Sequence, residues 1–120
     1  MSQLYRELIL DHYQNPQNTG MLSPHTHEAV EENTNCGDST SVQLNLKDGK
    51  ILEVKHVTEG CAISIASSSL LSEDIKGKTT EEIEKFDEKY IIKLLGGQLT
   101  TSRMNCALLP LKAIQKALLK

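Results

Sequence analysis

The sequence predicts an α+β fold in which a small antiparallel sheet packs against several helices. Residues 42–46 alternate between apolar and polar side chains, as a half-buried strand does. An Asp-Gly pair at 48–49 then supplies the turn of a tight hairpin. From Cys61 onward the apolar period changes from two to about 3.6 residues, which indicates helices. At 120 residues the chain is expected to form one domain, residues 1–120, around a single core.

The strands are predicted from alternation and from turn residues. A first strand is expected over residues 28–34, followed by the hairpin. The return strand, over about 51–58, should point three side chains to its buried face. These inward side chains are Leu52, Val54 and His56.

Helices are predicted both before and after the strands along the chain. Residues 3–14 carry apolar side chains on one helical face, and Asn15-Pro16 ends that helix. An irregular connection over 16–27 follows. Later helices are predicted from Cys61 to about 75, from a capping box of Thr79 and Glu82, over 87–95, and near the C-terminus.

The last helix contains a proline, which sets its predicted start. Proline lacks a backbone N–H and is tolerated best in the first helical turn. Pro110 therefore places the start near residue 107, with Cys106 just before it.

Composition excludes several functions. The chain has 13 basic and 16 acidic side chains, no tryptophan and 3% aromatic residues, which argues against a nucleic-acid-binding surface. Its first ten residues lack the basic segment and uninterrupted apolar run of a secretory signal, and no stretch approaches roughly 20 apolar residues, so we expect neither a signal peptide nor a membrane segment. An odd number of cysteines, 3, without a closely spaced pair favours reduced thiols and a cytoplasmic location. The expected partner is a protein.

Three separated cysteines suggest a metal site. Cys36, Cys61 and Cys106 each have a glycine or an asparagine as a neighbour, and Asp38 follows Cys36 after one glycine. Three thiolates and a carboxylate can hold a thiophilic metal or an iron–sulfur cluster. Free cysteine is also a common small buried residue. The predicted position of each cysteine at the junction of a loop and an element favours a shared site, but the spacing alone leaves both interpretations open.

The predicted helix starts bear on thiol chemistry. Cys61 and Cys106 are both expected at helix N-termini, where the backbone N–H groups favour a thiolate over a thiol. Arg103 lies three residues before Cys106, and its positive charge would favour that thiolate or a persulfide. We expect His12 and His56 to be structural rather than ligands.

Five stretches occur in the order found in one protein family. They are YRELILDHYQNPQNTG at 5–20, CGD at 36–38, DGKI at 48–51, EGCAISIASSSLLSE at 59–73 and RMNCALLPLKAIQKAL at 103–118. With these motifs the chain resembles the iron–sulfur cluster assembly scaffolds, the group of IscU, SufU and the N-terminal domain of NifU.

The resemblance implies a fold and a function. The fold is a three-stranded antiparallel sheet packed against a layer of four to five helices. The function is to accept persulfide sulfur from a pyridoxal-phosphate cysteine desulfurase, assemble a [2Fe-2S] cluster and transfer it to apo-proteins. The matching cluster ligands are Cys36, Asp38, Cys61 and Cys106, with Cys106 as the expected sulfur acceptor. Such a protein is a carrier rather than an enzyme.

A second function is implied by the SufU branch. There Zn²⁺ occupies the same four residues and the protein relays persulfide sulfur as a sulfurtransferase, with Cys36 as the preferred acceptor. A purely structural zinc site is a third interpretation.

The chain departs from both branches. Asn105 stands where the IscU branch has a histidine, which makes Asp38 the expected fourth ligand. Leu-Thr-Thr-Ser-Arg at 99–103 replaces the Leu-Pro-Pro-Val-Lys segment that a specialised Hsp70 chaperone reads, so the resemblance does not extend to that chaperone. Arg103 is typical of SufU, yet the stretch 76–102 has no room for the SufU insertion.

Overall fold

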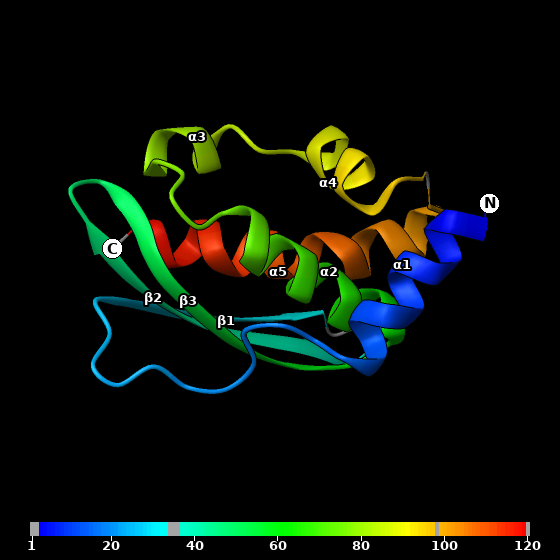
Figure 1. The fold of residues 1–120 in the computed structure, drawn as a ribbon, viewed down its shortest axis with the longest axis horizontal. Helices are drawn as coiled ribbons and strands as arrows, with labels where there is room; N and C mark the ends of the chain where they lie inside the picture. The colour runs from blue at the N-terminus through cyan, green and yellow to red at the C-terminus, as the bar shows by residue number, and fades with distance from the viewer. Residues whose placement is uncertain (1–2, 34–36, 98, 120) are drawn as a thin grey trace.

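A three-stranded antiparallel sheet in the order β1-β2-β3 forms one layer, and helices cover one of its faces (Figure 1). The computed structural model describes residues 3–33, 37–97 and 99–119, without the side chains of 3–5. The elements are α1 (Gln3–Gln14), β1 (His27–Asn33), β2 (Asp38–Lys47), β3 (Lys50–Glu59), α2 (Ala62–Asp74), α3 (Thr80–Glu84), α4 (Glu88–Leu95) and α5 (Thr101–Leu118). The predicted α+β class is confirmed.

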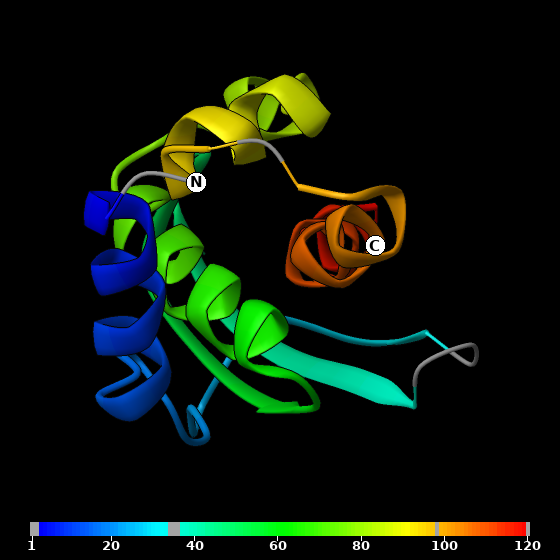
Figure 2. The same cartoon turned by 90° about the vertical axis from the view of Figure 1, so that its right-hand side faces the viewer.

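The helices form a layer whose centre is the pair α2 and α5. Helix α2 packs on β3, and α5 packs on β1 and β2, so the two cover the same face of the sheet (Figures 1 and 2). Helix α1 then packs against α2. Among the described residues no helix is long and apolar enough to cross a membrane.

The β2–β3 hairpin forms as predicted. Asp48 and Gly49 have φ angles of 55° and 77°. Two successive positive φ angles define the type I′ turn, whose twist matches that of the strands it joins. Lys47 pairs with Lys50 across this turn.

The prediction for Leu52 is wrong, because β3 carries an irregularity. Leu46 pairs with Ile51 whereas Asn45 pairs with Glu53, so Leu52 is an extra residue on β3. This extra residue reverses the alternation: Ile51 is buried, and Leu52 is 56% exposed. The other two predicted inward side chains, Val54 and His56, are buried.

Buried serines join α2 to its neighbours. The hydroxyl of Ser67 donates to the carbonyl of Ala107 on α5 at 2.7 Å, and that of Ser68 donates to the carbonyl of Ser64 at 2.8 Å. A buried hydroxyl without a partner would be costly, so these bonds let a helix with five buried serines pack in the core. The five are Ser64, Ser67, Ser68, Ser69 and Ser72.

The short helices begin and end where their capping residues predict. Thr79 and Glu82 form the capping box at the start of α3. Asp87 accepts hydrogen bonds from the first turn of α4, and Gly96, with φ 83°, ends that helix.

The predicted start of the last helix is wrong. Helix α5 begins at Thr101, so Pro110 lies inside the helix and Cys106 lies in the second turn. Pro110 removes the N–H that would normally bond to the carbonyl four residues earlier, that of Cys106. Oγ of Ser64, on α2, lies 3.3 Å from this carbonyl and 2.5 Å from Asp38, so the carbonyl receives at most the weaker part of a shared hydrogen bond. The helix continues through the proline to Leu118.

Two histidines are structural, as predicted. A ring nitrogen of His12 lies 2.7 Å from the Ser69 hydroxyl. Nε2 of His56 lies 2.8 Å from the carbonyl oxygen of Gln17, which ties β3 to the loop after α1. Burial lowers the pKa of His56 from its usual value of 6.5, against the raising effect of the Gln17 carbonyl, and nearby Lys55 lowers it further.

This lowered pKa predicts a pH dependence of stability. Below about pH 6.5 the unfolded chain binds a proton at His56 that the folded chain resists, so the free energy of unfolding falls as the pH falls. The contribution is at most about 1.4 kcal/mol per pH unit for one proton. Urea unfolding between pH 7.5 and 5.5 should therefore show a steeper loss for the wild type than for His56→Gln. Parallel curves for the two proteins would contradict this assignment.

Candidate metal centre

Three potential ligands from three separate elements meet at one end of the fold. They are Asp38 at the start of β2, Cys61 just before α2 and Cys106 on α5. A carboxylate oxygen and the two sulfur atoms all lie within 4.8 Å of one another. The elements that carry them converge at the right-hand end of Figure 1, which faces the viewer in Figure 2.

This spacing fits a metal ion. Bond lengths of about 2.0–2.3 Å in tetrahedral zinc sites place neighbouring ligand atoms about 3.5–3.8 Å apart. The upper limit of 4.8 Å on the separations of the three atoms is about 1 Å above that spacing. Two sulfur donors with one oxygen donor suit zinc or iron rather than magnesium or calcium.

Cys61 occupies the position predicted for it. It is the N-cap residue of α2, with φ −74° and ψ 167°, and its carbonyl accepts the first helical hydrogen bond, from Ile65. Its side chain is exposed. A metal ion or cluster bound here would be open to solvent on the Cys61 side.

Asp38 is held from two directions. Its carboxylate is 4% exposed and accepts a hydrogen bond of 2.5 Å from the Ser64 hydroxyl on α2. On another side it lies against Gly60, where a Cβ atom would come within 2.4 Å of the Asp38 Cγ. Gly60 also has a φ of 155°, which L-residues rarely adopt. Only glycine allows this close approach.

Cys106 is buried, at 8% exposure, and faces the same site from the second turn of α5. The expectation that a helix N-terminus favours its thiolate is therefore wrong, since that effect falls off within the first turn.

Cys36, the fourth predicted ligand, lies outside the described residues. The residue after it, Gly37, has the positive φ angle, 75°, expected for a sharp turn, and its N–H donates to the carbonyl of Asn33. This turn leads directly into Asp38.

An open cavity of about 430 Å³ adjoins the two cysteines. Arg103 is exposed and lines it between Ser102 and Cys106. The remaining lining residues are apolar: Ile9, Ala62 and Ile63. Arg103 therefore borders this cavity from the first turn of α5.

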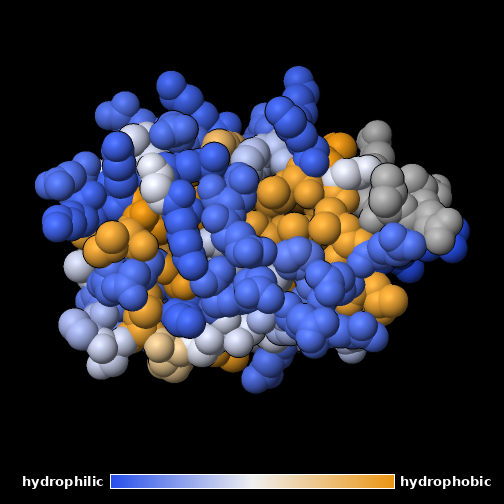
Figure 3. All heavy atoms as spheres, viewed as in Figure 1, coloured by the Kyte–Doolittle hydropathy of each residue, from blue (hydrophilic) through white to orange (hydrophobic). Residues whose placement is uncertain are grey.

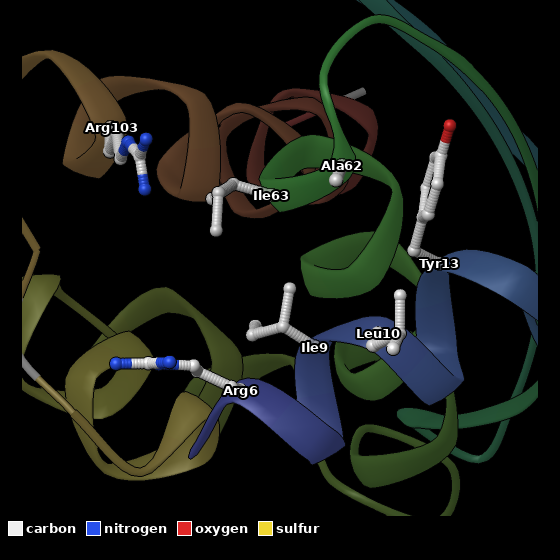
Figure 4. A pocket seen from close by; sticks show the side chains of 7 residues that line it. All are labelled: Arg6, Ile9, Leu10, Tyr13, Ala62, Ile63 and Arg103. Atoms are coloured by element: carbon white, nitrogen blue, oxygen red, sulfur yellow. The ribbon is translucent and has the colours of Figure 1, made fainter. Parts of the chain in front are cut away.

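A second cavity, of about 350 Å³, continues from the first because both contain Ile9, Ala62, Ile63 and Arg103. Its lining is mainly apolar, and Figure 4 shows Arg6 and Arg103 together at one end. We call the two cavities together the apolar groove. An apolar area is also visible near α1 and α4 on the largely hydrophilic face of Figure 3.

The chain contains only two arginines, Arg6 and Arg103, and both border this groove. Neither forms an ion pair with a carboxylate of the residues that the structure describes. Sequence reasoning missed Arg6, because nothing in the sequence shows that residues of α1 line the same cavity as Arg103. It also missed Gly60 and Ser64, whose roles depend on contacts with Asp38.

Comparison with known proteins places this chain in a family. Residues 4–120 match the NifU-like N terminal domain family. The iron–sulfur cluster assembly scaffold protein IscU 1 of Archaeoglobus fulgidus is 36% identical over 115 residues, covering 96% of this chain and 74% of that protein. The zinc-dependent sulfurtransferase SufU of Bacillus subtilis is 35% identical over 135 residues, covering 98% and 90%.

A solved structure agrees with these relatives. The crystal structure of a SufU from Fervidobacterium islandicum, assigned as a cluster assembly scaffold for the SUF system, superposes with a TM-score of 0.81. It is 30% identical and covers 98% of this chain and 99% of its own. The chain belongs to the NifU-like N terminal domain family, and the predicted resemblance is confirmed.

Proposed function

We propose that this chain is an iron–sulfur cluster assembly scaffold. It accepts sulfur from a cysteine desulfurase, assembles a [2Fe-2S] cluster on Cys36, Asp38, Cys61 and Cys106, and transfers the cluster to apo-proteins. The observation that carries this proposal is the convergence of Asp38, Cys61 and Cys106 within 4.8 Å. Relatives named as scaffolds, at 36% identity, support it.

Three thiolates and one carboxylate suit a cluster that must later be transferred. Thiolates bind iron strongly, whereas a carboxylate is a harder donor and a weaker ligand for a cluster. The exposed side chain of Cys61 opens the site to an acceptor protein. A cluster bound here is held by one weaker bond and is accessible from solvent, and both properties favour transfer.

Sulfur delivery follows ordinary thiol exchange. The Cys106 thiolate attacks the terminal sulfur of the desulfurase persulfide, a new S–S bond forms on Cys106, the old S–S bond breaks, and the desulfurase cysteine leaves as a thiolate. Cys106 and Arg103 line the same open cavity, which gives the incoming persulfide a route to Cys106. The Arg103 charge favours the anionic persulfide.

The second candidate is a zinc-dependent sulfurtransferase. The same four side chains suit tetrahedral zinc, which takes thiolate and carboxylate ligands. In that case Cys36, Asp38, Cys61 and Cys106 would hold the zinc, which would keep the site folded, and Cys36 would be the sulfur acceptor. The 35% identity to a relative named as such a sulfurtransferase favours this alternative.

The apolar groove is the proposed docking surface for the sulfur donor. Two arginines at one end and aliphatic side chains along its wall suit a protein segment with an acidic and an apolar residue, since arginine is favoured in interfacial ion pairs. We expect Arg6→Glu/Arg103→Glu to weaken binding of the desulfurase by at least about tenfold. Lys85→Glu/Lys112→Glu changes two exposed lysines that do not line the groove; it is the matched control and should bind normally. Equal losses in both variants would show a general charge effect instead.

Anaerobic incubation with desulfurase, cysteine and ferrous iron distinguishes the two functions. The scaffold predicts the visible spectrum of a [2Fe-2S] cluster, with two irons bound per cluster. A protein that retains zinc and stimulates desulfurase turnover without forming a cluster would instead support the sulfurtransferase. A protein that neither forms a cluster nor retains zinc and stimulates the desulfurase would contradict both proposed functions.

A further inference from the structure

Ser64 contacts each of the three candidate ligand residues that the structure describes. It is completely buried on the first turns of α2. Its Oγ lies 2.5 Å from Oδ2 of Asp38, 3.5 Å from Sγ of Cys61 and 3.3 Å from the carbonyl oxygen of Cys106. No ligand role falls to Ser64 itself, since a serine hydroxyl is a poor donor to zinc or iron beside thiolates.

The bond to Asp38 is the strongest of these contacts. A hydroxyl has one hydrogen, so Ser64 can donate fully to only one acceptor at a time. The carboxylate is charged and lies closest, and hydrogen bonds to charged acceptors are shorter and stronger than neutral ones. Each carboxylate oxygen has two lone pairs, so Asp38 can accept this bond and still coordinate an ion.

Gly60 further restricts the orientation of the Asp38 carboxylate. The backbone of Gly60 closes one side of the Asp38 carboxylate, and the Ser64 hydroxyl holds Oδ2 on another. A carboxylate held in this way does not lose rotational freedom when it binds a metal. Residues that orient metal ligands by hydrogen bonds often contribute substantially to affinity.

We propose that Ser64 is the positioning residue of the site. It holds Asp38 in the orientation that coordinates the metal or cluster, and it joins this ligand to the α5 turn that carries Cys106. The proposal rests on the proposed function, because it assumes that Asp38 is a ligand. It adds a residue that touches neither the cargo nor a partner.

Zinc affinity of two serine variants provides the test. Ser64→Ala and Ser67→Ala each remove one buried hydroxyl of α2 that bonds to an α5 carbonyl, but only Ser64 contacts Asp38. Competition with a chromogenic chelator should show zinc binding about 10–100-fold weaker in Ser64→Ala. Ser67→Ala should bind zinc as the wild type does. Equal affinity in all three proteins, or equal losses in the two variants, would overturn the proposal.

A double-mutant cycle separates positioning from a structural effect. In the Asp38→Ala background, Ser64→Ala should cause no further loss of zinc affinity, because the carboxylate it orients is absent. Additive losses would overturn the proposal. If the wild type itself bound no zinc or cluster, the proposed function would fail, which is a different outcome.

A further variant covers the contact with α5. Pro110→Ala returns the N–H that bonds to the Cys106 carbonyl in a regular helix, so Ser64→Ala/Pro110→Ala keeps α5 satisfied even if Ser64→Ala alone folds poorly. Zinc affinity should remain about 10–100-fold below that of Pro110→Ala alone, because Asp38 still lacks the hydrogen bond from Ser64. Recovery of affinity would show that Ser64 acts on α5 and not on Asp38.

Discussion

Gly60→Ala is expected to damage both the fold and the site. The new methyl group would lie 2.4 Å from Cγ and Oδ1 of Asp38, and the φ angle of 155° is unfavourable for alanine. Strain of this kind costs about 1–3 kcal/mol. The Asp38 carboxylate must also turn away, which breaks its bond to Ser64. We therefore expect lower stability in urea unfolding and zinc affinity reduced by at least about tenfold.

Gly77→Ala is the matched control. Gly77 also has a positive φ angle, 85°, but a Cβ there would meet nothing within 4 Å. It should lose stability through backbone strain while zinc affinity stays normal. Wild-type zinc affinity in Gly60→Ala would contradict the proposed contact between the glycine and the ligand.

Cys61→Ser is expected to abolish tight binding of zinc and of the cluster. The change replaces an exposed thiolate ligand by a hydroxyl, which is a poor donor to these metals. Because Cys61 is the N-cap of α2 and serine is a favoured N-cap residue, the helix should not be destabilised. Metal analysis after gel filtration and unfolding curves in the absence of metal provide the two measurements.

Ser102→Ala changes the wall of the same cavity without removing a thiol, and it should bind metal normally. Stoichiometric zinc in Cys61→Ser, at wild-type affinity, would place the metal elsewhere in the chain.

Local signals predicted much of the fold. The Asp-Gly turn, the capping box of Thr79 and Glu82, and the N-cap position of Cys61 each depend on residues close in sequence, and all three are confirmed. Such features are decided by local backbone chemistry, which a sequence displays directly.

The errors arose where distant contacts override local preference. Leu52 points outward because a register irregularity between β2 and β3 adds one residue. The start of α5 was misplaced because Pro110 is normally unfavourable inside a helix. Here Ser64, from another helix, lies 3.3 Å from the carbonyl that the proline leaves without its usual N–H partner. Neither contact is visible in the sequence.

The candidate site shows the same contrast between features set by residue chemistry and features set by distant contacts. The chemistry of cysteine and aspartate identified Asp38, Cys61 and Cys106 as candidates, because few side chains bind soft metals. Gly60 and Ser64 could not be recognised, because glycine and serine are common and acquire their roles only through contact with Asp38.

The central claim is that thiolates and the Asp38 carboxylate bind one metal centre together. X-ray absorption spectroscopy of the zinc-loaded wild type and of Asp38→Ala tests it most directly. We expect three sulfur donors and one oxygen donor in the wild type, with the Asp38 oxygen lost or replaced by water in the variant and the sulfur shell unchanged. A wild-type shell of nitrogen and oxygen donors alone would contradict it.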